Sequence, residues 1–245
     1  AYVLDSNGLS LTGHLAAPNR VGISGTAGLV ICHGFPSGAS QGVDNDRSYY
    51  EFADLVAKSL GWIVLAFTYR GCGGSEGEFS MQGWLDDTIN AAKDLKNNPQ
   101  VNSVWLAGFG TGGALAITAA SLYEEISGVA AISAPSDFRD WAQNPDQLLQ
   151  YSRTVGAISD PDFPQDEDSW AAEIDLIRPV EAAGEIGKKP LLVVHGASDQ
   201  VVPSFDARVL ADSHGGADLR IIDGGTHRLR FDPRASAIII GWLDR

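Results

Sequence analysis

Short apolar runs recur along the chain, and most are followed by a turn and a stretch with helical spacing. The runs that suit buried strands are Ala27–Cys32, Trp62–Phe67, Ser103–Ala107, Gly128–Ser133, Pro190–His195 and Leu219–Ile222. Uninterrupted apolar runs are typical of parallel strands that are covered on both faces. The alternation therefore predicts an α/β fold, with a mostly parallel sheet, right-handed crossovers and helices on both faces. Leu9–Ala16 is predicted to belong to an N-terminal β hairpin.

Helical spacing predicts helices in five segments between and after these runs: Ser48–Leu60, Leu85–Asn97, Gly112–Tyr123, Phe205–Ser213 and Pro233–Leu243. The stretch from Phe138 to Lys189 departs from this rhythm, because it has helical fragments, acids and prolines but no clear strand. We predict that residues 1–137 and 190–245 form the core and that 138–189 form a small helical lid. Asp160–Trp170 is predicted to be a loop. The alternative is a solvated, disordered insertion.

Composition limits the classes of partner. A net charge of −14 argues against nucleic acid and anionic membrane surfaces, because both would repel the chain. No apolar stretch approaches about 18 residues, and no export signal is visible, so a cytoplasmic protein is expected. Cys32 and Cys72 fit two reduced thiols, with a disulfide between them left open. No metal motif or P-loop occurs, and we expect no cofactor.

Polar motifs follow the predicted strands, where open α/β sheets bind ligands. They are His33–Pro36 (HGFP), Tyr69–Gly77 (YRGCGGSEG), His195–Pro203 (HGASDQVVP) and Gly224–His227 (GGTH). Together they resemble the α/β-hydrolase superfamily of serine esterases, acyl hydrolases and peptidases. The resemblance runs from about Leu9 to the C-terminus, outside 138–189. It implies a mostly parallel sheet of about eight strands with helices on both faces.

The resemblance also implies site residues. Asp199 matches the triad acid and His227 the triad histidine, which the acid would orient. The backbone N–H groups of Phe35 and Thr111 match the donors of the oxyanion hole. Arg70 is expected to tie loops together, and Ser75 nearby is not expected to be catalytic.

Glycine stands where the family has its nucleophilic serine. The family motif is G-x-S-x-G, and here the segment is Gly108–Phe109–Gly110–Thr111–Gly112. Glycine cannot attack a carbonyl, so the acyl-enzyme mechanism is closed. We therefore expect a homologue that binds a small acyl or ester-like molecule with weak, water-mediated or no hydrolysis. The alternatives are a competent hydrolase carrying an engineered serine-to-glycine change, and a non-enzymatic interaction protein.

Further expectations concern the ligand. His33, Gly34, Trp141 and Trp170 are candidate binding residues, although helical tryptophans are more often part of a core. Replacement of the nucleophile by the Thr111 hydroxyl or by Cys72 is disfavoured. Gly108–Gly113 also fits the dinucleotide fingerprint G-x-G-x-x-G, but the acidic residue that this fold needs after the next strand is poorly placed.

Overall fold

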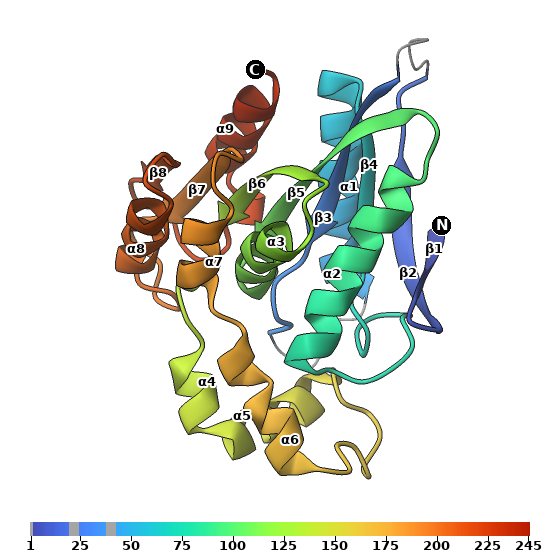
Figure 1. The fold of residues 1–245 in the computed structure, drawn as a ribbon, viewed down its shortest axis with the longest axis vertical. Coiled ribbons are helices and arrows are strands. Elements are labelled where there is room, and N and C mark those ends of the chain that lie inside the picture. The colour runs from blue at the N-terminus through green and yellow to red at the C-terminus, as the bar shows by residue number, and fades with distance from the viewer. Residues whose placement is uncertain (1, 20–24, 38–42) are drawn as a thin grey trace.

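The predicted sheet is confirmed. A computed structural model of the chain describes residues 2–19, 25–37 and 43–245, except for the side chains of 43–46. Over this part of the chain, eight strands form one sheet in the order β1-β2-β4-β3-β5-β6-β7-β8 (Figure 1). The strands are β1 (Tyr2–Ser6), β2 (Leu9–Ala16), β3 (Thr26–Cys32), β4 (Ile63–Phe67), β5 (Val101–Phe109), β6 (Ile126–Ile132), β7 (Leu191–Gly196) and β8 (Asp218–Ile222). β2 pairs antiparallel with β1 and with β4, and the pairs from β4 through β8 are parallel.

Helices cover both faces of the sheet, as predicted. α1 (Val43–Leu60) and α9 (Pro233–Leu243) contribute to one hydrophobic cluster. α2 (Met81–Lys96), α3 (Thr111–Leu122) and α8 (Ser204–His214) contribute to the other. Successive residues of a strand point to opposite faces, so Val30 and Leu65 enter the second cluster while Leu29 and Val64 enter the first. This is why the central strands are apolar along their whole length.

The insertion is helical, and one part of it was predicted wrongly. It contains α4 (Arg139–Gln143), α5 (Pro145–Val155), α6 (Glu167–Ala172), a 3₁₀ turn η1 (Ile174–Leu176) and α7 (Pro179–Glu185). The end of the predicted loop is the start of α6, because the Asp166 side chain accepts a hydrogen bond from the Ser169 N–H and caps the helix. Figure 1 shows α4, α5 and α6 standing away from the sheet, whereas α7 lies against α3 and α8.

Both cysteines are buried thiols, and neither belongs to a disulfide. Burial raises the pKa of the Cys32 thiol to about 12, so it stays protonated at neutral pH. Among the described helices, none combines the length and apolarity needed to cross a membrane.

Candidate active site

A tight turn joins β5 to α3 at Gly110. β5 ends at Phe109, α3 begins at Thr111, and Gly110 between them has φ 54° and ψ −124°. Its N–H donates to the carbonyl oxygen of Ile132 at 2.8 Å, which fixes the turn beside the end of β6. An L side chain rarely adopts this backbone conformation, and glycine adopts it readily.

Neighbouring glycines are required by packing. A Cβ on Gly108 would overlap the carbonyl of Gly112, and one on Gly113 would lie 2.9 Å from the carbonyl oxygen of Gly108. A Cβ on Gly112 would lie 2.6 Å from the carbonyl oxygen of Cys32. Close contact between backbones therefore accounts for this glycine pattern without a bound pyrophosphate. β6 also ends at Ile132 and is followed by Ser133 rather than by an acid, so the dinucleotide alternative gains no support.

The predicted acid and histidine meet at this turn. Asp199 follows β7 and His227 follows β8, and His227 Nδ1 lies 2.9 Å from Asp199 Oδ2. An ideal Cβ built on Gly110 would lie 3.6 Å from His227 Nε2. Because an ionised carboxylate only accepts hydrogen bonds, the shared hydrogen belongs to Nδ1. In the neutral ring, Nε2 then carries the lone pair that faces Gly110.

The Asp199 carboxylate is buried and has hydrogen-bond partners within the protein. Its Oδ1 accepts hydrogen bonds from the N–H groups of Val201 and Val202, at 2.8 and 2.9 Å. Its Oδ2 lies 3.3 Å from Nε2 of His195, in addition to its bond with His227. Burial raises the pKa of Asp199, but the hydrogen bonds from both histidines and the two N–H groups outweigh this and hold the pKa well below its usual range. The carboxylate is therefore ionised across neutral pH.

His195 is the site residue that sequence reasoning missed. His195 begins the His195–Pro203 motif, and no role of its own was predicted for it. Its fully buried ring contacts the same Asp199 oxygen as His227. Its Nε2 also lies 3.0 Å from the Val202 carbonyl oxygen. The signal was its spacing of four residues before Asp199, across the turn after β7.

The backbone on either side of the Gly110–His227 contact includes the two N–H groups that the family resemblance singled out. The Cβ position on Gly110 lies 3.7 Å from Gly34 Cα, so the Gly34–Phe35 peptide lies beside the turn. Among the described residues, neither the Phe35 N–H nor the Thr111 N–H donates a hydrogen bond.

The Phe35 ring lies between the core and the helical insertion. Its centroid is 5.2 Å from that of Trp141 on α4 and 6.0 Å from that of Tyr151 on α5. On the core side it contacts Phe79 and Trp84. The Tyr151 hydroxyl donates to the carbonyl oxygen of Pro36 at 3.3 Å. The insertion thus contacts the loop after β3 through α4 and α5.

Two of the other predicted binding residues lie in the core. The Trp170 side chain is buried, and its Nε1–H donates to the Phe79 carbonyl oxygen at 3.0 Å. His33 is 6% exposed, its Nδ1 is 2.7 Å from the Gly34 carbonyl oxygen, and its Nε2 accepts the Tyr69 N–H. Desolvation lowers the pKa of His33 to about 4, and the charge of Arg230 adds to this. Its ring therefore shapes the loop as a neutral group, with both nitrogens already bonded.

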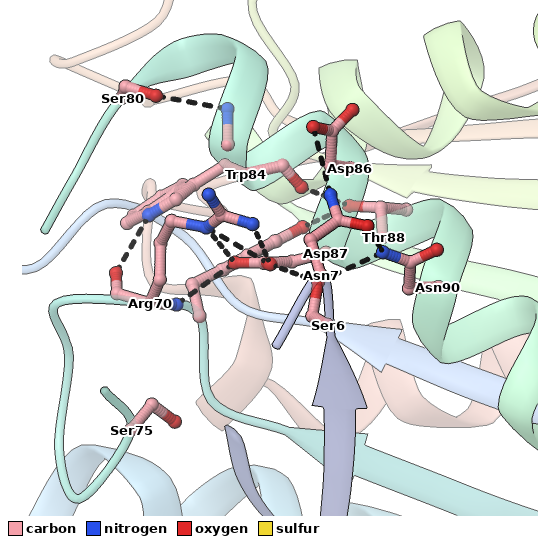
Figure 2. Close-up of polar contacts among 12 residues, drawn as sticks. Ser6, Asn7, Arg70, Ser75, Ser80, Trp84, Asp86, Asp87, Thr88 and Asn90 are labelled. Carbon is pink, nitrogen blue, oxygen red and sulfur yellow. Dashed lines mark hydrogen bonds and ion pairs between the residues drawn. The ribbon is translucent and has the colours of Figure 1, made fainter. Parts of the chain in front are cut away.

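Arg70 joins its loop to helix α2, whereas it was predicted to tie loops together. Figure 2 shows the Arg70 guanidinium facing the carboxylate of Asp87 on α2. Arg70 Nη2 and Asp87 Oδ1 are 2.7 Å apart, and Ser6 Oγ donates to the same Oδ1. The Ser75 hydroxyl donates to the Thr68 carbonyl oxygen at 2.6 Å and accepts the N–H of Thr12, so it is held within the fold.

No group of three or more His, Cys, Asp or Glu side chains is arranged to hold a metal ion in the described ranges. The groups described at the Gly110 turn are an imidazole, a carboxylate and backbone N–H groups.

The family model described as "Alpha/beta hydrolase family" matches residues 29–238. The chain belongs to the alpha/beta hydrolase family. Among curated relatives of this alpha/beta hydrolase, the Escherichia coli O157:H7 protein named "Uncharacterized protein YfhR" is 30% identical over 57% of this chain and 44% of its own length. The human mitochondrial palmitoyl-protein thioesterase ABHD10 is 26% identical over 71% of this chain and 60% of its own length. The matches thus span about half the length of these relatives.

Solved structures show the same fold. Est1E from Butyrivibrio proteoclasticus, in a structure with ferulic acid, is 20% identical with a TM-score of 0.73, covering 100% of this chain and 96% of its own. The Pyrococcus furiosus esterase Pf2001 is 19% identical with a TM-score of 0.70, covering 100% of this chain and 91% of its own. This alpha/beta hydrolase therefore shares the fold of both proteins.

Proposed function

We propose that this alpha/beta hydrolase binds a small acyl or ester-like molecule at the Gly110 turn and hydrolyses it weakly or not at all. The observation that carries the proposal is glycine in the left-handed turn that faces His227 Nε2. A serine in that position would place its Cβ 3.6 Å from the ring nitrogen, with its hydroxyl close enough for proton transfer. Glycine supplies no atom that could form an acyl-enzyme.

The remaining groups suit a carbonyl ligand. The Phe35 and Thr111 N–H groups would polarise its oxygen, and donors of this kind contribute about 3–4 kcal/mol to transition states in serine hydrolases. His227, oriented by Asp199, would activate a water molecule in place of the serine. Without the nucleophile, sites of this kind retain about 10³–10⁴-fold catalysis over water. Slow hydrolysis of activated esters is therefore compatible with the proposal.

The aromatic side chains of Phe35, Trp141 and Tyr151 favour an apolar acyl group. The Phe35 ring and the half-exposed Tyr151, at 43% exposure, lie next to the proposed oxygen-binding loop. Trp141 borders the same ring. The human relative is a palmitoyl-protein thioesterase, which agrees with an acyl ligand of low polarity.

The test restores the nucleophile. Hydrolysis of p-nitrophenyl acetate and p-nitrophenyl butyrate is measured for the native chain, for Gly110→Ser and for Gly110→Ser combined with His227→Gln. We expect Gly110→Ser to gain at least about 10²-fold, because removal of the serine from a comparable triad costs up to about 10⁶-fold in kcat, and we expect the double variant to lose that gain. Gly110→Ala controls for the backbone change.

Robust steady-state turnover by the native chain would contradict the proposal. A gain that does not need His227 would show that the imidazole and the turn do not work together. A serine codon at this position in the encoding gene would instead identify a competent enzyme whose serine has been replaced.

A further inference from the structure

We propose that the site catalyses proton transfer at carbon: His227 removes a hydrogen from the carbon next to the carbonyl of a bound acyl compound and exchanges it with solvent. The inference rests on the proposed acyl-binding function and assigns the site a reaction other than hydrolysis. It follows from the combination of a positioned base with two oxyanion donors and no nucleophile.

The imidazole of His227 faces the side-chain position of Gly110. The Cβ position on Gly110 has His227 Nε2 at 3.6 Å, Gly34 Cα at 3.7 Å and His227 Cε1 at 3.8 Å as its nearest neighbours. In a serine enzyme, the side chain would lie here with its hydroxyl toward Nε2. With glycine at 110, the proposal places the α-carbon of an acyl group in front of Nε2, at van der Waals distance from the Gly110 Cα.

The oxygen of the same ligand would reach the backbone donors. The Phe35 and Thr111 N–H groups donate no hydrogen bond within the described part of the chain. The Gly34–Phe35 peptide lies beside the Cβ position of Gly110, and Thr111 follows Gly110 directly. The proposal seats the carbonyl on these donors with its α-carbon, one bond from the carbonyl carbon, toward Nε2.

The step balances with the groups present. The Nε2 lone pair takes the α-proton, the C–H electron pair forms a carbon–carbon double bond, and the carbonyl π pair moves to oxygen. The two N–H groups hold the resulting enolate oxygen. The imidazolium is stabilised by the buried Asp199 carboxylate through the 2.9 Å bond at Nδ1. Return of a solvent-derived proton to carbon completes the exchange, and no oxidant, reductant or metal is consumed.

Glycine favours this reaction over acyl transfer for two reasons. Serine at 110 would compete for the imidazole lone pair, because its hydroxyl would donate to Nε2. It would also attack the carbonyl carbon, so that an ester would be consumed before its α-carbon reached the base. Gly110→Ser is therefore expected to convert an exchange site into a hydrolytic one.

The test uses benzylacetone, a ketone that offers a carbonyl, α-hydrogens and an aromatic ring but no bond that an esterase can hydrolyse. Binding is measured by saturation-transfer NMR, and exchange by the loss of α-proton signals in deuterium oxide near neutral pD. His14 supplies a matched control, because it forms another histidine–aspartate pair, with Nε2 2.7 Å from Asp54 Oδ1, away from the site on β2. The variants are His227→Gln, His14→Gln and Gly110→Ser.

We expect the native chain and His14→Gln to exchange the α-hydrogens about 10²-fold faster than His227→Gln, as for a positioned general base. Gly110→Ser should bind the ketone but exchange it more slowly than the native chain. Bound ketone that exchanges at the buffer rate overturns the inference and leaves the acyl-binding proposal standing. Absence of ketone binding also overturns the inference, and if Gly110→Ser then shows no esterase gain, the acyl-binding proposal falls with it.

Discussion

A side chain at position 110 should lower the free energy of unfolding through the backbone alone. Gly110 has φ 54°, yet a Cβ there would meet its nearest atoms only at 3.6–3.8 Å, so no steric overlap accompanies the substitution. Holding a residue with a Cβ in such a region costs about 1–3 kcal/mol. For a chain of this length, that cost lowers the melting temperature by about 2–12 °C.

The perturbation is Gly110→Ala, with Gly110→Ser beside it, and the assay is thermal and urea unfolding followed by circular dichroism. Serine carries the same backbone cost as alanine but can regain about 1 kcal/mol through a hydrogen bond to His227 Nε2. We therefore expect the native chain to be most stable, Gly110→Ser intermediate and Gly110→Ala least stable.

Gly241→Ser is the control for the chemical change itself. Gly241 lies in α9 with an ordinary φ, and no atom lies within 4 Å of its Cβ position. Serine there should stabilise the helix by a few tenths of a kcal/mol, up to about 0.5. If Gly110→Ala proves as stable as the native chain, the turn is not strained and the reasoning about position 110 is wrong.

Three other substitutions test separate parts of the fold. His33 has a pKa of about 4 in the folded chain, against about 6.5 in the unfolded chain, so protonation favours the unfolded state. The free energy of unfolding should lose about 3 kcal/mol as the pH falls from 6.5 to 4. His33→Gln should remove this loss from the stability profile measured in urea. Asp87→Asn should cost about 3–5 kcal/mol in urea unfolding, because it leaves the Arg70 guanidinium without its buried counter-charge. Ser133→Gly should raise stability by about 1 kcal/mol in a thermal melt, because Ser133 has φ 51° and its buried Oγ has no partner among the described residues; an unchanged or lower stability would argue against strain there.

The sheet and the histidine–aspartate pair could be predicted because their signals are local. Apolar runs that fill both faces of a strand identify the parallel sheet, and Asp199 and His227 each follow a strand at the same edge. Their motifs follow the chain order of the α/β-hydrolase superfamily, and it was this resemblance that placed the two residues together. Their contact in the structure agrees with that interpretation.

The features that the sequence did not predict depend on tertiary contacts. The four-residue spacing puts His195 close to Asp199 in the chain, but it does not show that the ring reaches the same carboxylate oxygen as His227. That contact needs the turn after β7 to fold back. The position of Trp170 in the core depends on a hydrogen bond to the distant Phe79 carbonyl oxygen. The cap that Asp166 provides for α6 was visible in the sequence, but the surrounding acids and prolines favoured a loop.

The interlocked glycines around the β5–α3 joint have a genetic consequence. A Cβ would lie too close to neighbouring backbone atoms or to Ala134 at three glycines, which are residues 108, 112 and 113. At position 110 a Cβ meets no such overlap, and only the backbone conformation disfavours it. A mutation at codon 110 can therefore change the chemistry of the turn between β5 and α3 while the other glycines of the turn are kept. Some glycine and serine codons differ by a single base, so either residue can replace the other at position 110 in one mutational step without a change in the rest of the fold.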